Sequence, residues 1–282
     1  MKRIRLILAA ALLLGVFAAL QTPVLAERYT VDGYEIPIDV LLNGSYLDKQ
    51  AKGYLDDGVT YVPVRGLAEA MGFDVLWDPH LSAAIIEKED VSLVIYTADG
   101  CCYINDAPYF PGIRFENGTL YAPARFLAET LGAAVEWDDY RFEVKLTLPG
   151  YTVPEGRIET EYNAEDLLWL SRITTCESGS VSFDAKIAVA NVVLNRRASS
   201  SFPDTVHDVI FDKKFGVQFP PAHNGKIYNT PTTNTILACK VAFSGVQVAK
   251  DCLYFTYSYD TSSWVVKHGK KYLVIGRQAF YQ

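Results

Sequence analysis

Residues 57–78 read DGVTYVPVRGLAEAMGFDVLWD, and residues 117–138 read NGTLYAPARFLAETLGAAVEWD. Eleven of the 22 aligned positions are identical at an offset of 60 residues. Self-similarity over this length marks a duplicated supersecondary unit. The sequence therefore predicts that the first half of the chain is built from two copies of one unit.

Each copy predicts a strand, a helix and a second strand, because apolar runs alternate with residues that break or cap these elements. A turn at Asp57-Gly58 or Asn117-Gly118 precedes the first strand, and Gly72 or Gly132 is suited to cap the helix. Further β-rich segments follow at 83–86, 92–96 and 142–146. We therefore expect an α+β fold with one helix packed on strands in each copy.

The repeated YVPVR and WD elements resemble the copper amine oxidase N-terminal-like domain, over about residues 36–148. The resemblance implies a stalk or surface module of exported bacterial proteins. We expect no metal here, because His80 is the one histidine of this segment and reads as an exposed turn residue. We interpret the module as a scaffold or a wall-adhesion unit.

Two pairs of repeated side chains have alternative roles. Trp77 and Trp137 could present their rings to sugars, but a tryptophan that closes a strand beside an apolar helix is more often part of the core. We therefore expect both in the core. Arg65 and Arg125 are expected to pair with an acid or to cap a helix.

The first 26 residues have the pattern of a signal peptide. Lys2, Arg3 and Arg5 precede an apolar run of 15 residues, Leu6 to Leu20, and Ala26 offers a cleavage point. The run is short for a membrane span, which favours a signal peptide, and an uncleaved anchor is the alternative. We expect a secreted or cell-wall protein with no other membrane segment.

Composition excludes several classes of protein. Half of the residues are hydrophobic, which argues against disorder, and residues 27–282 carry 23 basic against 33 acidic side chains. Such a balance disfavours nucleic acid and anionic membranes as partners, because both select basic surfaces. A neutral or mixed-charge polymer fits better, and the oligomeric state stays open.

The five cysteines follow no zinc-ligand spacing. Cys101 and Cys102 are adjacent, where a mutual bridge would be strained. A bridge between Cys239 and Cys252 is one expectation, and two buried thiols are the equal alternative.

A Pro- and Gly-rich stretch at 149–156 predicts a domain boundary. The expected organisation is a signal peptide at 1–26, the repeat domain at 27–148, a linker at 149–162 and a second domain at 163–282. Within the second domain we expect helices near 164–176, capped by Asn163, near 183–197, capped by Ser182, and from Thr230 to about Ala242. Strands are expected near 252–257 and 271–275.

The second domain resembles the cell-wall hydrolase family that includes spore cortex-lytic enzymes. The matching motifs, in order, are a glutamate after the first helix, AVANVVLNR, FPDTV, GVQF, the segment 238–245, LYF, Trp264 and IGRQAFY. The resemblance implies a lysozyme-like, helix-rich α+β hydrolase domain that cleaves the glycan strands of peptidoglycan without a cofactor. It also implies that Glu177 is the catalytic acid.

The residues around Glu177 support this role. A helix that ends near Cys176 delivers Glu177 to the mouth of a cleft, where burial and the helix dipole would raise its pKa. Glycoside cleavage commonly uses two carboxylates, yet Asp184, Asp204, Asp212 and Asp260 all lie near turns or caps. The lack of an evident second acid favours a lytic transglycosylase, with a muramidase or glucosaminidase as the alternative.

Several aromatic and amide side chains are candidates for binding the glycan, namely Gln218, Phe219, Tyr257 and Trp264. Asn191, Asn195 and Arg196 are expected instead to satisfy buried backbone groups. The closing motif departs from the family, because Gln278 stands where the pattern Gly-Asn-His-x-Phe-Tyr has histidine.

Two other functions remain as alternatives. The missing histidine is consistent with a wall-binding protein whose hydrolase-like domain is inactive. A peptidase or amidase would use Cys176 as nucleophile, with His207, His223 or His268 as base, but a helix C-terminus raises the pKa of a thiol.

Overall fold

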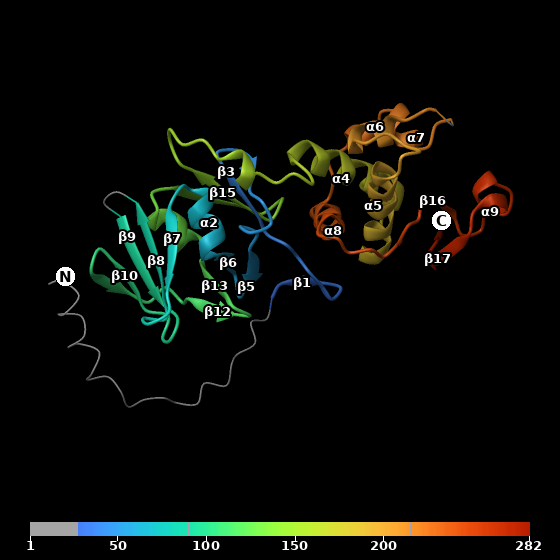
Figure 1. Ribbon diagram of the computed structural model, residues 1–282. Helices are drawn as coiled ribbons and strands as arrows, with labels where there is room; N and C mark the ends of the chain where they lie inside the picture. Colours follow the sequence, from blue (N-terminus) through green and yellow to red (C-terminus); the bar gives the residue numbers. More distant parts are fainter. Residues whose placement is uncertain (1–27, 89–90, 215) are drawn as a thin grey trace.

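The computed structural model describes residues 28–88, 91–214 and 216–282. The predicted signal peptide lies outside the described residues. Figure 1 shows a β-rich N-terminal part and a helical C-terminal part that ends in a small sheet. Within the described residues, no helix is both long and apolar enough to span a membrane.

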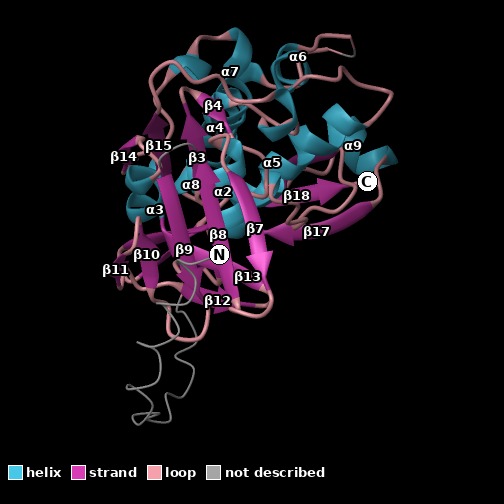
Figure 2. Ribbon diagram, turned by 60° about the vertical axis from the view of Figure 1, so that its left-hand side comes forward, coloured by secondary structure: helices cyan, strands magenta, loops and turns pink. Residues whose placement is uncertain are grey.

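Three sheets and a hairpin make up the N-terminal part (Figure 2). Its strands are β1 (Thr30–Val31), β2 (Tyr34–Glu35), β3 (Asp39–Leu42), β4 (Ser45–Tyr46), β5 (Tyr54–Asp56), β6 (Val59–Pro63), β7 (Asp74–Asp78), β8 (Ala83–Lys88), β9 (Val91–Tyr96), β10 (Cys102–Ile104), β11 (Ala107–Tyr109), β12 (Arg114–Glu116), β13 (Thr119–Pro123), β14 (Ala134–Asp138) and β15 (Glu143–Thr147). Its helices are α2 (Val64–Ala70) and α3 (Ala124–Thr130).

The two repeats meet in the middle of one sheet, whose strand order is β12-β13-β6-β5. Strands β6 and β13 are antiparallel, with Tyr61 opposite Pro123 and Pro63 opposite Tyr121. Because Tyr61 and Tyr121 are equivalent in the repeat, this register relates the two copies by a local two-fold axis. The predicted duplication of a strand, a helix and a strand is therefore confirmed.

The repeated arginines and glycines act as predicted. Arg65 pairs with Glu69, and Arg125 pairs with Glu129, each at 3.0 Å across one helical turn. Gly72 follows helix α2 with a φ of +80°, a left-handed conformation that favours glycine.

The expectation of a buried tryptophan in both copies was wrong for the first one. Trp77 is 45% exposed, whereas Trp137 is half-buried and packs against Phe142. The two positions are equivalent in sequence, so the difference comes from their neighbours.

The remaining elements begin after residue 154. They are η1 (Glu155–Arg157), α4 (Ala164–Ser178), α5 (Phe183–Ala198), α6 (Val206–Phe211), α7 (Pro220–His223), η2 (Lys226–Tyr228), α8 (Thr233–Phe243), β16 (Tyr254–Tyr257), α9 (Trp264–His268), β17 (Lys271–Ile275) and β18 (Gln278–Tyr281). The expected α+β class is confirmed. Helix α8 begins at Thr233 rather than Thr230, because Thr232 accepts the capping hydrogen bond from the amide of Thr235.

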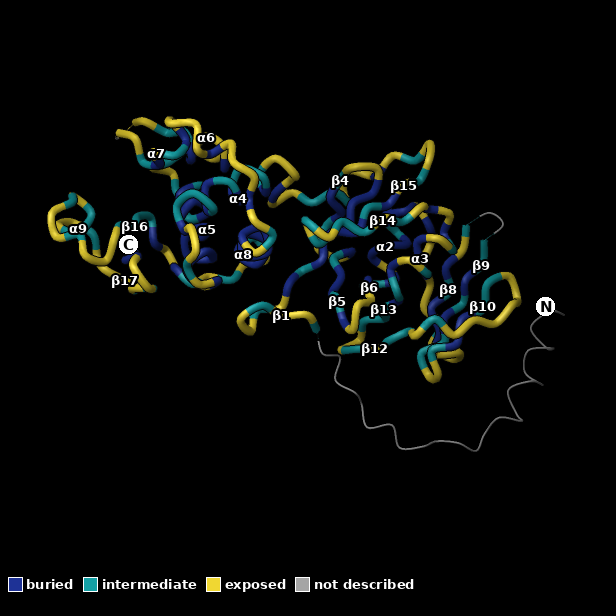
Figure 3. Tube along the Cα trace, turned by 180° about the vertical axis from the view of Figure 1, so that it is seen from behind, coloured by how far each residue is buried: buried dark blue, intermediate teal, exposed yellow. Residues whose placement is uncertain are grey.

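Helix α5 is the centre of the C-terminal part (Figure 3). One side packs against α4 and α8, and the other packs Val189 and Val192 against Phe280 of the sheet β16-β18-β17. Asn191 and Asn195 bond the backbone of the segment that leads into this sheet, as predicted. The helix is therefore buried on both sides and holds the sheet beside the end of α4.

Polar side chains buried at the contact between the two parts join them. Lys240 of α8 lies 2.8 Å from Asp39 of β3 and donates to the carbonyl of Phe142 at 3.0 Å. Tyr162 donates to Asp39 at 2.5 Å, and its ring stacks on Phe243 at 4.3 Å. The side chains of Asp39, Lys240 and Tyr162 are almost fully buried, so the two parts form a packed interface.

Candidate active site

Glu177 lies in the last turn of α4. The helix begins with a capping box, in which Asn163 accepts from the amides of Glu165 and Asp166 while Asp166 accepts from the amide of Asn163. It ends at Gly179, whose φ is +55°. Helix α4 therefore continues two residues beyond the predicted end at Cys176 and contains Glu177.

The Glu177 carboxyl is partly withdrawn from solvent. Its Oε1 is buried and accepts no hydrogen bond from the described part of the chain. Burial raises the pKa of Glu177 to about 7, and the charge of Arg196 opposes part of that rise. Near neutral pH the carboxyl can therefore hold a proton and can also release it.

Arg196 contacts the candidate residues Gln218 and Phe219, and its charge acts on Glu177. It projects from α5, is 4% exposed, and donates from Nε to the carbonyl of Leu253 at 2.7 Å and from Nη2 to Oε1 of Gln218 at 3.3 Å. Burial lowers its pKa to about 10, so it remains a cation at neutral pH. The prediction that Arg196 satisfies a backbone group is confirmed, and its effect on Glu177 was missed.

Aromatic rings surround the Arg196 guanidinium. Its Cζ lies 5.0 to 5.4 Å from the ring centroids of Phe202, Phe219 and Tyr254. Phe219 is 1% exposed and also packs against Phe255, so its ring has no face open to a ligand in this structure. This position suits Phe219 for holding Arg196.

Tyr257 and Trp264 lie on the surface beside this cluster, each 60% exposed. Tyr257 stacks on Tyr259 with ring centroids 5.2 Å apart. Trp264 meets Tyr254 edge-on at 5.7 Å, which links it through Tyr254 to Arg196. Exposed aromatic rings of this kind offer apolar faces on which sugar rings can stack.

Gln278 contacts the residue that carries the candidate acid. It is 5% exposed in β18, pairs in register with Tyr257, and donates from Nε2 to the main-chain carbonyl of Glu177 at 3.1 Å. A hydrogen bond at the end of α4 limits the movement of Glu177. The glutamine at the position of the family histidine therefore still has a polar contact with the site.

Three of the acids considered as a second carboxyl lie in turns or at a helix start. Asp212 accepts from the amide of Lys214, and Asp260 accepts from the amides of Ser262 and Ser263. Asp184 lies in the first turn of α5. These positions agree with the structural roles that the sequence predicts for them.

Cys176 lacks the environment of an activated thiol. Burial and the neighbouring Glu177 raise its pKa, and its sulfur lies 3.4 Å from the carbonyl of Lys226. Two of the three candidate bases are engaged elsewhere, since His207 bonds Asp208 and His268 bonds the carbonyl of Trp264, and the ring of the third, His223, packs edge-on against Phe211. A thiolate nucleophile at Cys176 is therefore disfavoured.

The expected bridge between Cys239 and Cys252 is absent, and all five cysteines are free. Cys239 lies inside the cluster formed by α4, α5 and α8, whereas Cys252 packs on the other side of α5 against the sheet. The alternative reading of both as buried thiols is confirmed.

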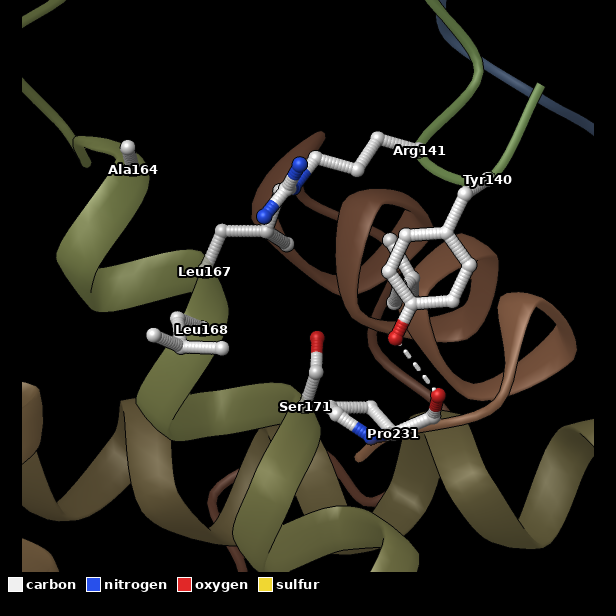
Figure 4. Close-up of a pocket in the computed structure, with 8 residues that line it drawn as sticks. Tyr140, Arg141, Ala164, Leu167, Leu168, Ser171 and Pro231 are labelled. Carbon is white, nitrogen blue, oxygen red and sulfur yellow. Dashed lines mark hydrogen bonds between the residues drawn. The ribbon is translucent and has the colours of Figure 1, made fainter. Parts of the chain in front are cut away.

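A small pocket of about 20 Å³ lies at the contact between the two parts (Figure 4). The hydroxyl of Tyr140 points to the carbonyl of Pro231 across it, at 2.7 Å, while Leu167 and Ser171 line the other side. Its size admits water but no sugar ring, and it contains none of the predicted site residues. Among the described residues, no group of three or more His, Cys, Asp or Glu could hold a metal ion.

Two family models match the chain. Residues 41–146 match the copper amine oxidase N-terminal domain, and residues 180–281 match the Cell Wall Hydrolase domain. Glu177 lies just before the second matched range.

Curated relatives match the C-terminal part. A spore cortex-lytic enzyme of Bacillus cereus is 33% identical over 117 residues, which are 41% of this chain and 42% of the relative. One of Oceanobacillus iheyensis is 30% identical over 118 residues, which are 42% of this chain and 40% of the relative. The chain thus spans about two fifths of the length of these curated relatives.

Among solved structures, the catalytic domain of the germination-specific lytic transglycosylase SleB from Bacillus anthracis is similar. It is 29% identical with a TM-score of 0.40, over 46% of this chain and 100% of that domain.

Proposed function

We propose that this chain, which carries a cell wall hydrolase domain after a copper amine oxidase N-terminal-like domain, cleaves the glycan strands of peptidoglycan as a lytic transglycosylase. The observation that carries the proposal is the half-buried Glu177, whose pKa of about 7 lies where a general acid and base must operate. The names of the matched relatives support the substrate class.

In this reaction Glu177 serves twice. Its protonated carboxyl first donates a proton to the glycosidic oxygen, and the bond from that oxygen to C1 of N-acetylmuramic acid breaks. The resulting carboxylate then takes the proton of the 6-hydroxyl on the same sugar, whose oxygen bonds to C1. The products are a 1,6-anhydro sugar and a free hydroxyl on the leaving sugar, and no water is consumed.

A single carboxyl suffices for this sequence of steps. Hydrolysis would need a second group to activate water, and Asp212 and Asp260 are held by the backbone amides of their own turns. Arg196 has a supporting role, because its charge favours the carboxylate that forms after the first proton transfer. Gln218, Tyr257 and Trp264 would bind the strand, with Phe219 holding Arg196.

The N-terminal residues 1–26 would direct this enzyme out of the cell, so that it meets its polymer in the cell wall. Mass spectrometry of the products from purified peptidoglycan tests the reaction type. The proposal predicts ends that are 1,6-anhydro-N-acetylmuramic acid. New reducing ends, heavier by one water, would instead indicate a hydrolase, and no soluble product would favour an inactive wall-binding protein.

A further inference from the structure

The hairpins that follow α2 and α3 have the same backbone conformation. In β7 and β8 Asp78 pairs with Ala83, and in β14 and β15 Asp138 pairs with Glu143 at the equivalent positions. Asp78 accepts hydrogen bonds from the amides of His80 and Leu81. Asp138 accepts from the amides of Tyr140 and Arg141, which stand at the equivalent positions. Differences between the two hairpins therefore come from their side chains.

The tryptophans on these hairpins differ in what covers them. In the second copy, the indole Nε1 of Trp137 donates to Asp139, and Phe142 meets the ring edge-on at 5.5 Å. The equivalent residues in the first copy are Pro79 and Ser82, which provide neither a carboxylate nor an aromatic ring. Trp77 is left 45% exposed.

A groove of about 370 Å³ opens beside Trp77. Its walls are Trp77 and Val75 of β7, Arg65 of α2 and the hairpin of β12 and β13, from which Phe115 projects with 53% of its surface exposed. The volume lies within the range of ligand pockets, roughly 300 to 1,000 Å³. Two exposed aromatic rings thus lie in one groove with a guanidinium.

We propose that this groove binds sugar rings of a peptidoglycan glycan strand, a choice of ligand that rests on the proposed function. A pyranose has an apolar C–H face and a rim of hydroxyl and acetamido groups. The indole of Trp77 matches the face, while the Arg65 guanidinium and Thr119 match the rim. Arg65 is paired with Glu69 at 3.0 Å, so the groove suits a neutral ligand.

Addition of a peptide strand is the competing use of this surface, because β7 is the edge of a five-stranded sheet. The Arg65 side chain already donates to the carbonyl of Val75 on this edge, at 2.7 Å. That bond occupies a backbone acceptor that an added strand would need. A ligand that stacks on a ring fits the groove better than one that extends the sheet.

A second glycan site changes how the protein acts on its polymer. Two weak sites on one rigid body raise each other's effective concentration along a shared strand. The repeat domain would then hold the enzyme on the wall between cleavage events. The cleavage rate of a small soluble fragment, which fills only the Glu177 site, would not depend on the groove.

The test uses the full chain and two variants that should weaken binding in different ways, one by removing the ring and one by covering it. Trp77→Ala removes the ring. Ser82→Phe places over Trp77 the side chain that covers Trp137, at a position where Phe142 already adopts the same positive φ in the second copy. Phe110→Ala is the control, because Phe110 is 75% exposed on the same domain but lies outside the groove.

Dissociation constants are measured at low temperature for insoluble glycan strands freed of their stem peptides. We expect both groove variants to bind about fivefold to tenfold more weakly, with Phe110→Ala unchanged. Cleavage rates on short soluble fragments should stay at the unmodified level, which separates this site from the one at Glu177. Unchanged binding in correctly folded Ser82→Phe protein overturns the proposal, as does a loss of binding seen only when stem peptides are present.

Discussion

Burial of the Glu177 carboxyl couples the stability of the fold to pH. The pKa rises from its ordinary 4.5 to about 7 on folding. Between these values the folded protein keeps a proton that the unfolded chain releases. The free energy of unfolding therefore falls as pH rises from about 4.5 to 7, and the loss is complete above pH 7.

Glu177→Gln should remove this pH-dependent loss of stability, since the amide does not ionise. We expect the variant to be more stable than the unmodified protein at pH 8, by up to about 3 kcal/mol, and equally stable at pH 4. Urea unfolding curves at the two pH values measure the difference. An equal difference in stability between the two proteins at pH 4 and at pH 8 would show that ionisation of the Glu177 carboxyl does not cause it.

Arg196 sets how far the pKa of Glu177 rises, because its charge opposes the effect of burial. The proton donor is lost as Glu177 ionises, so kcat/KM should fall with increasing pH through the pKa of the free enzyme, near 7. Arg196→Met should move this decline to higher pH, whereas Arg196→Lys, which keeps the charge, should leave it closer to its original position. Identical pH profiles for the two variants would contradict the electrostatic role.

At the scale of elements, local sequence patterns predicted the repeat units and the three long helices of the second domain. They missed α6, α7, α9 and β18, which are short and take their form from tertiary contacts. The exposure of Trp77 was also missed, because it depends on the residue five positions later, Ser82 in one copy and Phe142 in the other. Lys240 carries no local sign of burial, since its partner Asp39 belongs to the other domain.

The buried pair of Asp39 and Lys240 gives a prediction for the interface. Removing one partner leaves a charge buried without full compensation. Asp39→Ala should therefore lower the free energy of unfolding by about 3 kcal/mol. Chemical denaturation measures it, with Arg125→Ala as the control, because the exposed pair of Arg125 and Glu129 should contribute less than about 1 kcal/mol.

An equal loss of free energy of unfolding in Asp39→Ala and Arg125→Ala would show that the buried pair of Asp39 and Lys240 contributes no more than a surface ion pair. A loss confined to Asp39→Ala supports an interface that holds the two domains together.

At the scale of the whole molecule, the segment predicted as a linker is packed against the repeat domain. Tyr151 donates to the carbonyl of Ala70 at 2.9 Å, and Arg157 donates to the carbonyl of Gly66 at 2.5 Å. The hydrophobic core also extends from one domain into the other. The order of the two domains could be predicted from sequence, but their contact could not, because it joins residues that are distant in the chain.

This packing predicts resistance to proteolysis between the domains. Trypsin should cut slowly at Arg157, whose side chain is 15% exposed, and faster at the exposed Lys213 after α6. Mass spectrometry of the fragments over time identifies the first cut. Early release of two halves by cleavage at Arg157 would show that the segment is a flexible tether.

The candidate site was predicted from sequence through single residues, and the structure adds how they are joined. Gln218 and Trp264 were predicted separately. Arg196 contacts Gln218 directly and Trp264 through Tyr254, and its charge acts on Glu177. Such links come from the packing of α4, α5 and the sheet, which no local motif encodes.

The rate of glycan cleavage by Glu177→Gln measures whether this carboxyl is the catalytic acid. Glu165→Gln is the matched control, since Glu165 lies on the same helix at its exposed beginning. We expect a fall of about 10²- to 10⁴-fold for Glu177→Gln and little change for the control, with folding preserved in both. Near-normal cleavage by correctly folded Glu177→Gln protein would contradict the assignment of the acid and the mechanism built on it.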